Sequence, residues 1–190
     1  MRIPLPLLPA LMAAVLMLPA GCASYRHVAL PLGSPLIERE EQDLTLSLRF
    51  VNELELRRLF GAKTNPFLTR RWLLPYPRLL VFELAAAHRG AVRLQWSLKG
   101  CELSMGGKIL LPMSPAGLGG YWESRDRNPE ANRARTQILE KHMLPASAIV
   151  YPGEVLRGYL VFRAAGDPAG PVRVKIVLSM QNLQLSLIHI

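Results

Sequence analysis

The stretch that decides the fold is residues 149–162, which read IVYPGEVLRGYLVF. Its centre, Tyr151–Glu154, has the composition of a tight turn, because proline fixes φ and glycine tolerates positive φ. After the turn, apolar and mixed positions alternate: Leu156, Gly158, Leu160 and Phe162 on one side, Val155, Arg157, Tyr159 and Val161 on the other. A period of two predicts a strand that buries one face in a core.

The same period of two recurs on both sides of this stretch. Alternating segments lie at 44–50, 92–98, 156–162, 172–178 and 183–187, and the mostly apolar block 78–84 is continuous enough for a strand near the core. Turn residues separate them: His88-Arg89-Gly90 is expected to form a hairpin connection, and Gly106-Gly107 a second, tighter hairpin. Roughly six to eight short strands with turn signals predict a mainly β chain, folded as an antiparallel sandwich or barrel.

One or two short surface helices are expected beside the strands. Asn52 and Glu55 partly match a capping box, and Gly61 supplies a stop for the short helix that would follow. Asn128 as cap and Pro129 at the first position predict a helical insertion around residues 128–143. Its thin apolar stripe consists of Ala131, Ala134 and Ile138. The glycine-rich segment 117–122 is expected to be a flexible loop.

Residues 149–162 also resemble the penultimate-strand segment of immunoglobulin-like domains found in many small bacterial lipoproteins. In those domains the Pro-Gly turn redirects the chain between sheets, and the phenylalanine that Phe162 matches fills the core. The resemblance is confined to this one segment. It implies an immunoglobulin-like β-sandwich and no activity, because that architecture hosts unrelated functions.

The N-terminus resembles a bacterial lipoprotein signal. Met1-Arg2 is a short positive region, residues 3–18 carry no charge, and Leu18-Pro19-Ala20-Gly21-Cys22 ends the run. Its prolines make a poor membrane-spanning helix. The resemblance implies a diacylglycerol on Cys22, cleavage just before it and acylation of the new amino group. Pro19 stands where the family prefers leucine. The alternative is an ordinary secretory signal, cut near Ala20 or Ala23.

These features divide the chain into three parts. Residues 1–21 are expected to be the signal peptide, 22–42 the lipidated N-terminus and tether, and 43–190 the sandwich domain. The acidic run Glu38, Glu40, Glu41 and Asp43 is assigned to solvated tether, because it lacks the spacing of a calcium loop. Ala23 rather than aspartate follows the cysteine, which in the enterobacterial sorting pattern implies the outer membrane, with the domain on the periplasmic side.

The net charge and the cysteine content limit which classes of partner the chain can bind and which disulfide bonds it can form. The formal net charge of the 190 residues is +9, which suits anionic lipid and glycan of an envelope. Basicity also suits nucleic acid, but an exported chain does not meet it. With Cys22 acylated, Cys101 is the only thiol left of the two cysteines, so no internal disulfide can form. A buried, inert cysteine is the expected role of Cys101.

Catalytic and metal motifs are not found in the sequence. The four histidines, His27, His88, His142 and His189, stand apart from one another. Neither His-Glu-x-x-His nor Gly-x-Ser-x-Gly occurs. We therefore expect no enzyme, no cofactor and no metal site, with His88 a turn residue and His142 a helix-end residue.

A candidate interaction patch combines arginine with aromatic residues, which are common interface anchors. It consists of Arg70, Arg71, Trp72, Tyr121 and Trp122. The alternative is a loop that covers an open end of the sandwich, with Trp72 and Phe67 in the core. Likewise, Tyr121 and Trp122 either hold the helical insertion in place or face a ligand.

The expected function is a non-enzymatic binding or structural module of the cell envelope, attached to the membrane through its N-terminal lipid and holding an envelope protein partner. Confinement to a surface raises the effective concentration of any membrane-associated partner. The alternative is a carrier of lipid or a small molecule, with a cavity between the sheets. The oligomeric state is left open by the sequence.

Overall fold

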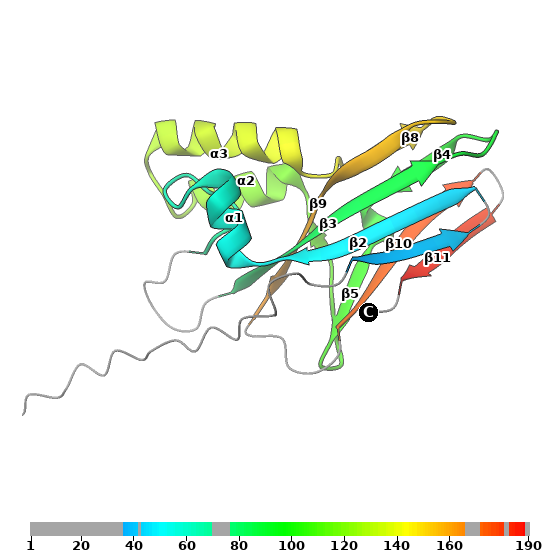
Figure 1. Ribbon diagram of the computed structural model, residues 1–190. Coiled ribbons are helices and arrows are strands. Elements are labelled where there is room, and N and C mark those ends of the chain that lie inside the picture. The colour runs from blue at the N-terminus through cyan, green and yellow to red at the C-terminus, as the bar shows by residue number, and fades with distance from the viewer. Residues whose placement is uncertain (1–35, 42, 70–76, 166–171, 181–182, 189–190) are drawn as a thin grey trace, which may run out of the picture.

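The computed structural model describes residues 36–41, 43–69, 77–165, 172–180 and 183–188. Within these residues the chain forms two antiparallel sheets and three α-helices (Figure 1). The prediction of a mainly β chain built from antiparallel sheets is therefore confirmed. The structure has three helices in the described residues, where the sequence predicted one or two.

The first sheet, sheet A, has the strand order β1-β2-β3-β9-β7, with every neighbouring pair antiparallel. The strands are β1 (Ile37–Glu41), β2 (Leu44–Val51), β3 (Arg78–His88), β9 (Val155–Ala164) and β7 (Pro112–Met113). The segment 149–162 thus supplies most of β9, which lies next to the long central strand β3. These two strands pair from Arg78↔Ala164 to Ala87↔Val155.

The second sheet, sheet B, has the order β6-β5-β10-β4-β8, and β11 pairs with β10 off this path. Its strands are β4 (Leu94–Ser97), β5 (Glu102–Met105), β6 (Lys108–Leu110), β8 (Ser147–Val150), β10 (Val172–Met180) and β11 (Leu183–Ile188), and a 3-10 turn, η1 (Leu98–Gly100), precedes β5. The expected glycine hairpin joins β5 to β6. Gly106 and Gly107 have φ of 53° and 75°, in the left-handed range that such a turn needs.

One hydrophobic core lies between the sheets. The alternating residues of β2 and β3 enter it together with Trp96, Leu103 and Ile176 of sheet B. Trp96 is fully buried, and its Nε1 donates to the carbonyl of Pro145 at 2.8 Å. Burying a leucine or phenylalanine contributes about 1.5–3 kcal/mol, so this cluster is the main source of stability.

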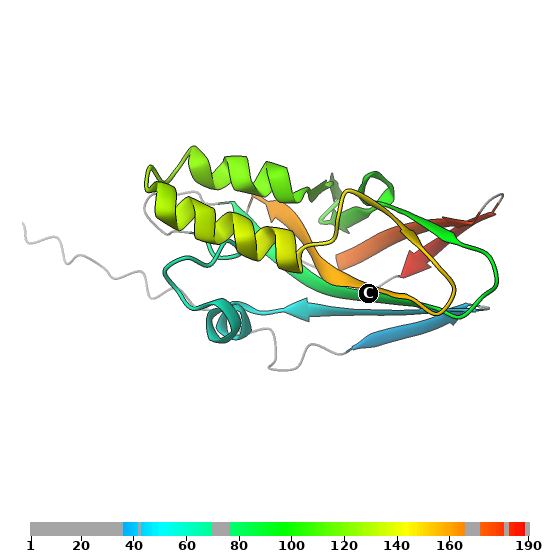
Figure 2. The same ribbon diagram turned by 90° about the horizontal axis from the view of Figure 1, so that it is seen from above.

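The opposite face of sheet A carries a second core, under the helices. These are α1 (Glu53–Phe60), α2 (Pro115–Glu123) and α3 (Pro129–His142). Val51, Val81 and Val161 meet Leu56 of α1 and Leu139 of α3 there. The helices gather at one end of sheet A, with α2 and α3 side by side (Figures 1 and 2). The described chain is therefore layered as helices, sheet A and sheet B.

Both predicted helix starts are confirmed. The side chain of Asn52 accepts from the N–H of Glu55 at 2.9 Å, and Gly61 ends α1 with φ 71°. Asn128 caps α3 by accepting from the N–H groups of Glu130 and Ala131, with Pro129 at the first position. The predicted apolar stripe of α3 is confirmed in part: Ile138 packs against the second core, but the fully buried residues of this helix are Arg135 and Leu139.

The connection from α3 to β8 passes the edge of β9 at Gly158. Met143 forms a parallel bridge with Tyr159, and the N–H of Leu144 donates to the Tyr159 carbonyl at 3.0 Å. A Cβ at position 158 would lie 3.0 Å from the carbonyl oxygen of His142 and 3.0 Å from the nitrogen of Leu144. Glycine is needed here because the two backbones approach too closely for a side chain.

The predicted hairpin at His88-Arg89-Gly90 was wrong. The strand before it, β3, pairs with β2 and β9, whereas β4 pairs with β8 and β10, so this connection crosses between the sheets. His88 is buried, and its Nε2 contacts the Val92 carbonyl. Its backbone exchanges hydrogen bonds with Gly153 and Glu154, which ties the crossing to the β8–β9 turn.

Two assignments from composition were also wrong. Residues 37–41 of the expected 22–42 tether form β1, because Ile37 packs against the core while exposed Glu38, Arg39 and Glu40 keep this edge strand polar. The expected flexible loop at 117–122 lies within α2, which Ser114 caps by accepting from the N–H of Gly117 at 3.0 Å.

Candidate interaction surface

The candidate surface comprises the C-terminal half of α2, the turn from α2 to α3 (residues 124–128) and the end of β9. Trp122 fixes α2 to the body of the protein. It is 2% exposed, and its Nε1 donates to the Pro66 carbonyl at 2.7 Å. The guanidinium carbon of Arg135 lies 4.5 Å from the centroid of its ring. Trp122 therefore holds the helices together and does not present its ring to a partner, which excludes it from the predicted patch.

Asn65 fixes the loop that Trp122 contacts. Its side-chain amide donates to the carbonyls of Leu56 and Gly61, at 2.8 and 3.0 Å, and its oxygen accepts from the N–H of Phe67 at 3.0 Å. The buried amide thus closes the loop after α1 and sets the backbone at Pro66. An Asn-Pro pair is typical of a turn, but it does not indicate that the asparagine side chain is buried.

A buried ion pair fixes the turn between α2 and α3. The Nη2 of Arg135 lies 2.8 Å from Oδ2 of Asp126, and Nη1 donates to the Asn132 side chain at 2.7 Å. Asn132 in turn donates to the Asp126 carbonyl at 2.6 Å. Asp126 thus has a buried partner nine residues away, which the sequence pattern does not reveal because charged residues are rarely buried.

Tyr121 lies beside two exposed arginines from different elements. The guanidinium carbon of Arg125 is 4.0 Å from the centroid of the Tyr121 ring, and that of Arg163, on β9, is 5.6 Å from it. Among the described residues, neither guanidinium has a carboxylate partner. We call these three residues the Arg–Tyr cluster. Tyr121 belonged to the predicted patch, whereas Arg125 and Arg163 were not singled out, because they lie far apart in the chain.

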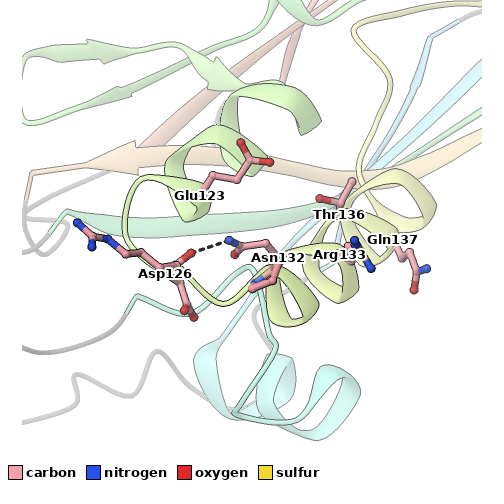
Figure 3. Close-up of a pocket in the computed structure, with 8 residues that line it drawn as sticks. Glu123, Asp126, Asn132, Arg133, Thr136 and Gln137 are labelled. Carbon is pink, nitrogen blue, oxygen red and sulfur yellow. Dashed lines mark hydrogen bonds between the residues drawn. The ribbon is translucent and has the colours of Figure 1, made fainter.

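An open depression of about 670 Å³ lies between α2 and α3 (Figure 3). All but one of the residues that line it are of polar or charged type, and they are Glu123, Asp126, Arg127, Pro129, Asn132, Arg133, Thr136 and Gln137. Figure 3 shows the hydrogen bond from Asn132 to Asp126 in its wall. Small-molecule sites of similar volume are mostly apolar and enclosed. This depression is therefore a feature of the surface and unlike the interior of a carrier.

A charged network crosses the outer face of sheet A next to α1. Arg49 pairs with Glu55 of α1 and with Glu83 of β3, both at 2.6 Å, and Arg157 of β9 pairs with Glu83 at 2.5 Å. Burial favours the protonated carboxyl, but the hydrogen bonds and charges of Arg157 and Arg49 outweigh it and lower the pKa of Glu83. The network ties α1 to three strands.

The two histidines in the described residues have structural surroundings. His88 lies buried in the crossing between the sheets. His142 lies in the last turn of α3 and its ring stacks on Tyr159, with Phe60 edge-on. Burial and the charge of Lys141 lower the pKa of His142. Within the described ranges, no three of the His, Cys, Asp and Glu residues are grouped so as to hold a metal ion.

Cys101 is fully buried, as the sequence predicted, and burial raises the pKa of its thiol to about 11. The remaining predicted site residues, Cys22, Arg70, Arg71 and Trp72, lie outside the described residues, as do His27 and His189. No helix in the part of the chain that the structure describes has the length and apolar character needed to cross a membrane.

Comparison with known proteins gives no family. No family model matches the chain, and no curated protein matches it. Three solved structures are similar over most of this chain. The yjhA protein of Bacillus subtilis is 11% identical, with a TM-score of 0.39, over 74% of this chain and 76% of its own. A functionally unknown protein of Listeria monocytogenes is 10% identical, with a TM-score of 0.42, over 80% and 79%.

The third structure is a "putative lipoprotein (ycdA)" of Bacillus subtilis, 8% identical with a TM-score of 0.45. The match covers 80% of this chain but only 38% of that protein, so this chain spans well under half of its length. At such low identities and TM-scores, these likenesses establish neither a family nor an activity for this chain.

Proposed function

We propose that this protein is a lipid-anchored lipoprotein of the bacterial envelope, facing the periplasm at the outer membrane, and that its domain is a non-enzymatic binding or assembly module. Support for the anchor comes from the sequence that ends at Cys22, with a positive start, an uncharged apolar run and small residues before the cysteine. The two packed sheets and the Pro-Gly turn before β9 support the finer proposal of an immunoglobulin-like sandwich.

The filled interior is the observation that favours a protein that binds its partner on its outer surface. Trp96, Phe162 and Leu84 have no exposed surface, and they belong to one cluster with residues of both sheets. Close-packed side chains leave no room for a bound lipid between these strands. This favours a module that binds on its outside over the alternative, a carrier with a cavity between the sheets.

Tethering supplies the mechanism. A domain held at a membrane by Cys22 meets any partner in the same membrane at a local concentration far above that in bulk. Weak contacts then suffice for assembly, and the domain needs no deep pocket. The exposed guanidiniums of the Arg–Tyr cluster provide one such contact surface.

The test compares the full-length protein with its Cys22→Ala variant in the cell. Membrane fractionation followed by cross-linking, affinity capture and mass spectrometry is expected to recover the parent in the membrane with a specific envelope component, and to lose both for the variant. Recovery of bulk envelope protein alone, at the same level for parent and variant, would contradict the proposal. Native mass spectrometry of the parent tests the alternative function. A carrier would hold a non-covalently bound lipid in addition to the covalent acyl chains.

A further inference from the structure

The Arg–Tyr cluster concentrates positive charge on one side of α2. Arg125 and Arg163 are both exposed, lie over the same tyrosine ring, and have no carboxylate partner in the described residues. A guanidinium offers parallel N–H donors that match the oxygens of a phosphate. The cluster is therefore suited to phosphate groups.

The nearby carboxylates do not cancel this charge. Asp126 is already neutralised by the buried Arg135, at 2.8 Å. Glu123 lies two residues after Tyr121, about 200° further around the helix, and it lines the depression between α2 and α3 (Figure 3). Tyr121 is half-buried, and an amphipathic aromatic ring of this kind is suited to a boundary between apolar and aqueous surroundings.

The cluster lies toward the end of sheet A from which β1 starts. Ile37 begins β1 beside Leu48, in the same row as Leu84 and Gly158. Strand β1 runs away from the helical end of sheet A, and Arg163 lies about 17 Å from Gly158 along β9 toward that end. Residues 23–36 separate Cys22 from Ile37, and a chain of this length spans at most about 50 Å.

We propose that the Arg–Tyr cluster binds the phosphates of anionic lipid headgroups, so that the domain docks with its helical end on the membrane that holds its lipid anchor. This inference rests on the proposed function, because it requires the anchor at Cys22. Each arginine near an anionic surface strengthens attachment by about fivefold. Docking would fix the orientation of the domain and turn the β8–β9 turn away from the membrane.

The experiment uses the mature, lipid-anchored protein in phosphatidylcholine vesicles with and without phosphatidylglycerol. A fluorophore is attached through Ser124→Cys, beside Arg125, or through Tyr151→Cys, at the far end of sheet A. Cys101 is fully buried and Cys22 is acylated, so each variant carries one label. A headgroup-borne quencher reports contact with the surface. Quenching is expected at position 124, only with phosphatidylglycerol and only at low salt, and not at position 151.

The double variant Arg125→Ala/Arg163→Ala is expected to reduce docking about 25-fold. Arg89→Ala/Arg93→Ala is the matched control, since it removes the same charge from exposed positions in the β3–β4 connection and should leave docking unchanged. Equal quenching with and without phosphatidylglycerol, or equal loss in the two double variants, would overturn the docking surface while leaving the anchor intact. Failure of the parent to stay with the vesicles would instead overturn the anchor itself, and the inference with it.

Discussion

Asp126 and Arg135 form an ion pair of 2.8 Å in which the arginine side chain is only 2% exposed. The pair links the α2–α3 turn to the centre of α3, and the guanidinium also lies over the Trp122 ring. The Nε of Arg135 has no hydrogen-bond partner within the described part of the chain. The charge of Arg135 therefore depends on the Asp126 carboxylate for its compensation.

Asp126→Asn is expected to lower the free energy of unfolding by about 3–5 kcal/mol, because it leaves a buried guanidinium without a counter-charge. Urea denaturation measures this loss. Arg57→Gln, which breaks the exposed ion pair with Glu53 at 2.7 Å, is the control and should cost about 0.5 kcal/mol or less. A similar small loss for both variants would show that Asp126 does not compensate Arg135.

Gly158→Ala is expected to destabilise the protein by about 1–3 kcal/mol, because the new methyl group would press on backbone atoms of His142 and Leu144. The matched change is Gly119→Ala in α2, where a Cβ would meet nothing within 4 Å. This second variant should raise stability by about 0.5–1 kcal/mol, since alanine favours helix. Thermal or urea unfolding of the two variants compares them, and equal effects would contradict the close crossing at Gly158.

The lowered pKa of Glu83 predicts that the free energy of unfolding depends on pH. Its pKa in the folded protein lies below the ordinary value of 4.5, because Arg157 and Arg49 outweigh the effect of burial. A carboxyl group whose pKa is lower in the folded than in the unfolded protein stabilises the fold. The contribution of Glu83 is fully present above pH 4.5 and is lost as the pH falls through its folded-state pKa. The difference in unfolding free energy between the parent and Glu83→Gln should therefore shrink on acidification. Glu140→Gln, at an exposed helix position, serves as the control, and a constant difference for Glu83→Gln would contradict the network.

The sequence predicted those parts of the fold in which local pattern and tertiary structure agree. The alternation of β2 and β10, the caps at Asn52 and Asn128 and the glycine hairpin are each encoded within a few residues. The predicted burial of only one face of β9 was wrong for its second half, because Tyr159 and Val161 lie in the second core while Leu160 and Phe162 lie in the first. The connection at His88 was not predictable in this way. A period of two shows which face of a strand is buried, but not which sheet the next strand joins.

The helix α2 and the candidate surface could not be predicted for a second reason, which is that tertiary packing decides their structure. Three glycines, Gly117, Gly119 and Gly120, disfavour a helix locally, yet Leu118 and Trp122 bury the same face and hold it in place. Ser114 followed by Pro115 was the available start signal. Arg163 joins Tyr121 and Arg125 only through the packing of α2 near the end of β9, so no short-range pattern could have grouped the three.

Cys101 is expected to be inert in the folded protein. Burial raises the pKa of its thiol to about 11, so little thiolate forms at neutral pH. In the Cys22→Ala variant, a thiol reagent such as DTNB should find no reactive group until the protein is unfolded, and then one per chain. Rapid reaction under native conditions would contradict the burial of Cys101 between the sheets.

The intact mass of the mature protein tests most directly whether Cys22 carries the lipid anchor of this binding module. An anchor at Cys22 predicts a chain that begins at residue 22, with a mass increased by a diacylglycerol and an amide-linked acyl group, and an unprocessed chain for Cys22→Ala. A mature protein that begins elsewhere, or that begins at residue 22 with no added acyl mass, would contradict the anchor.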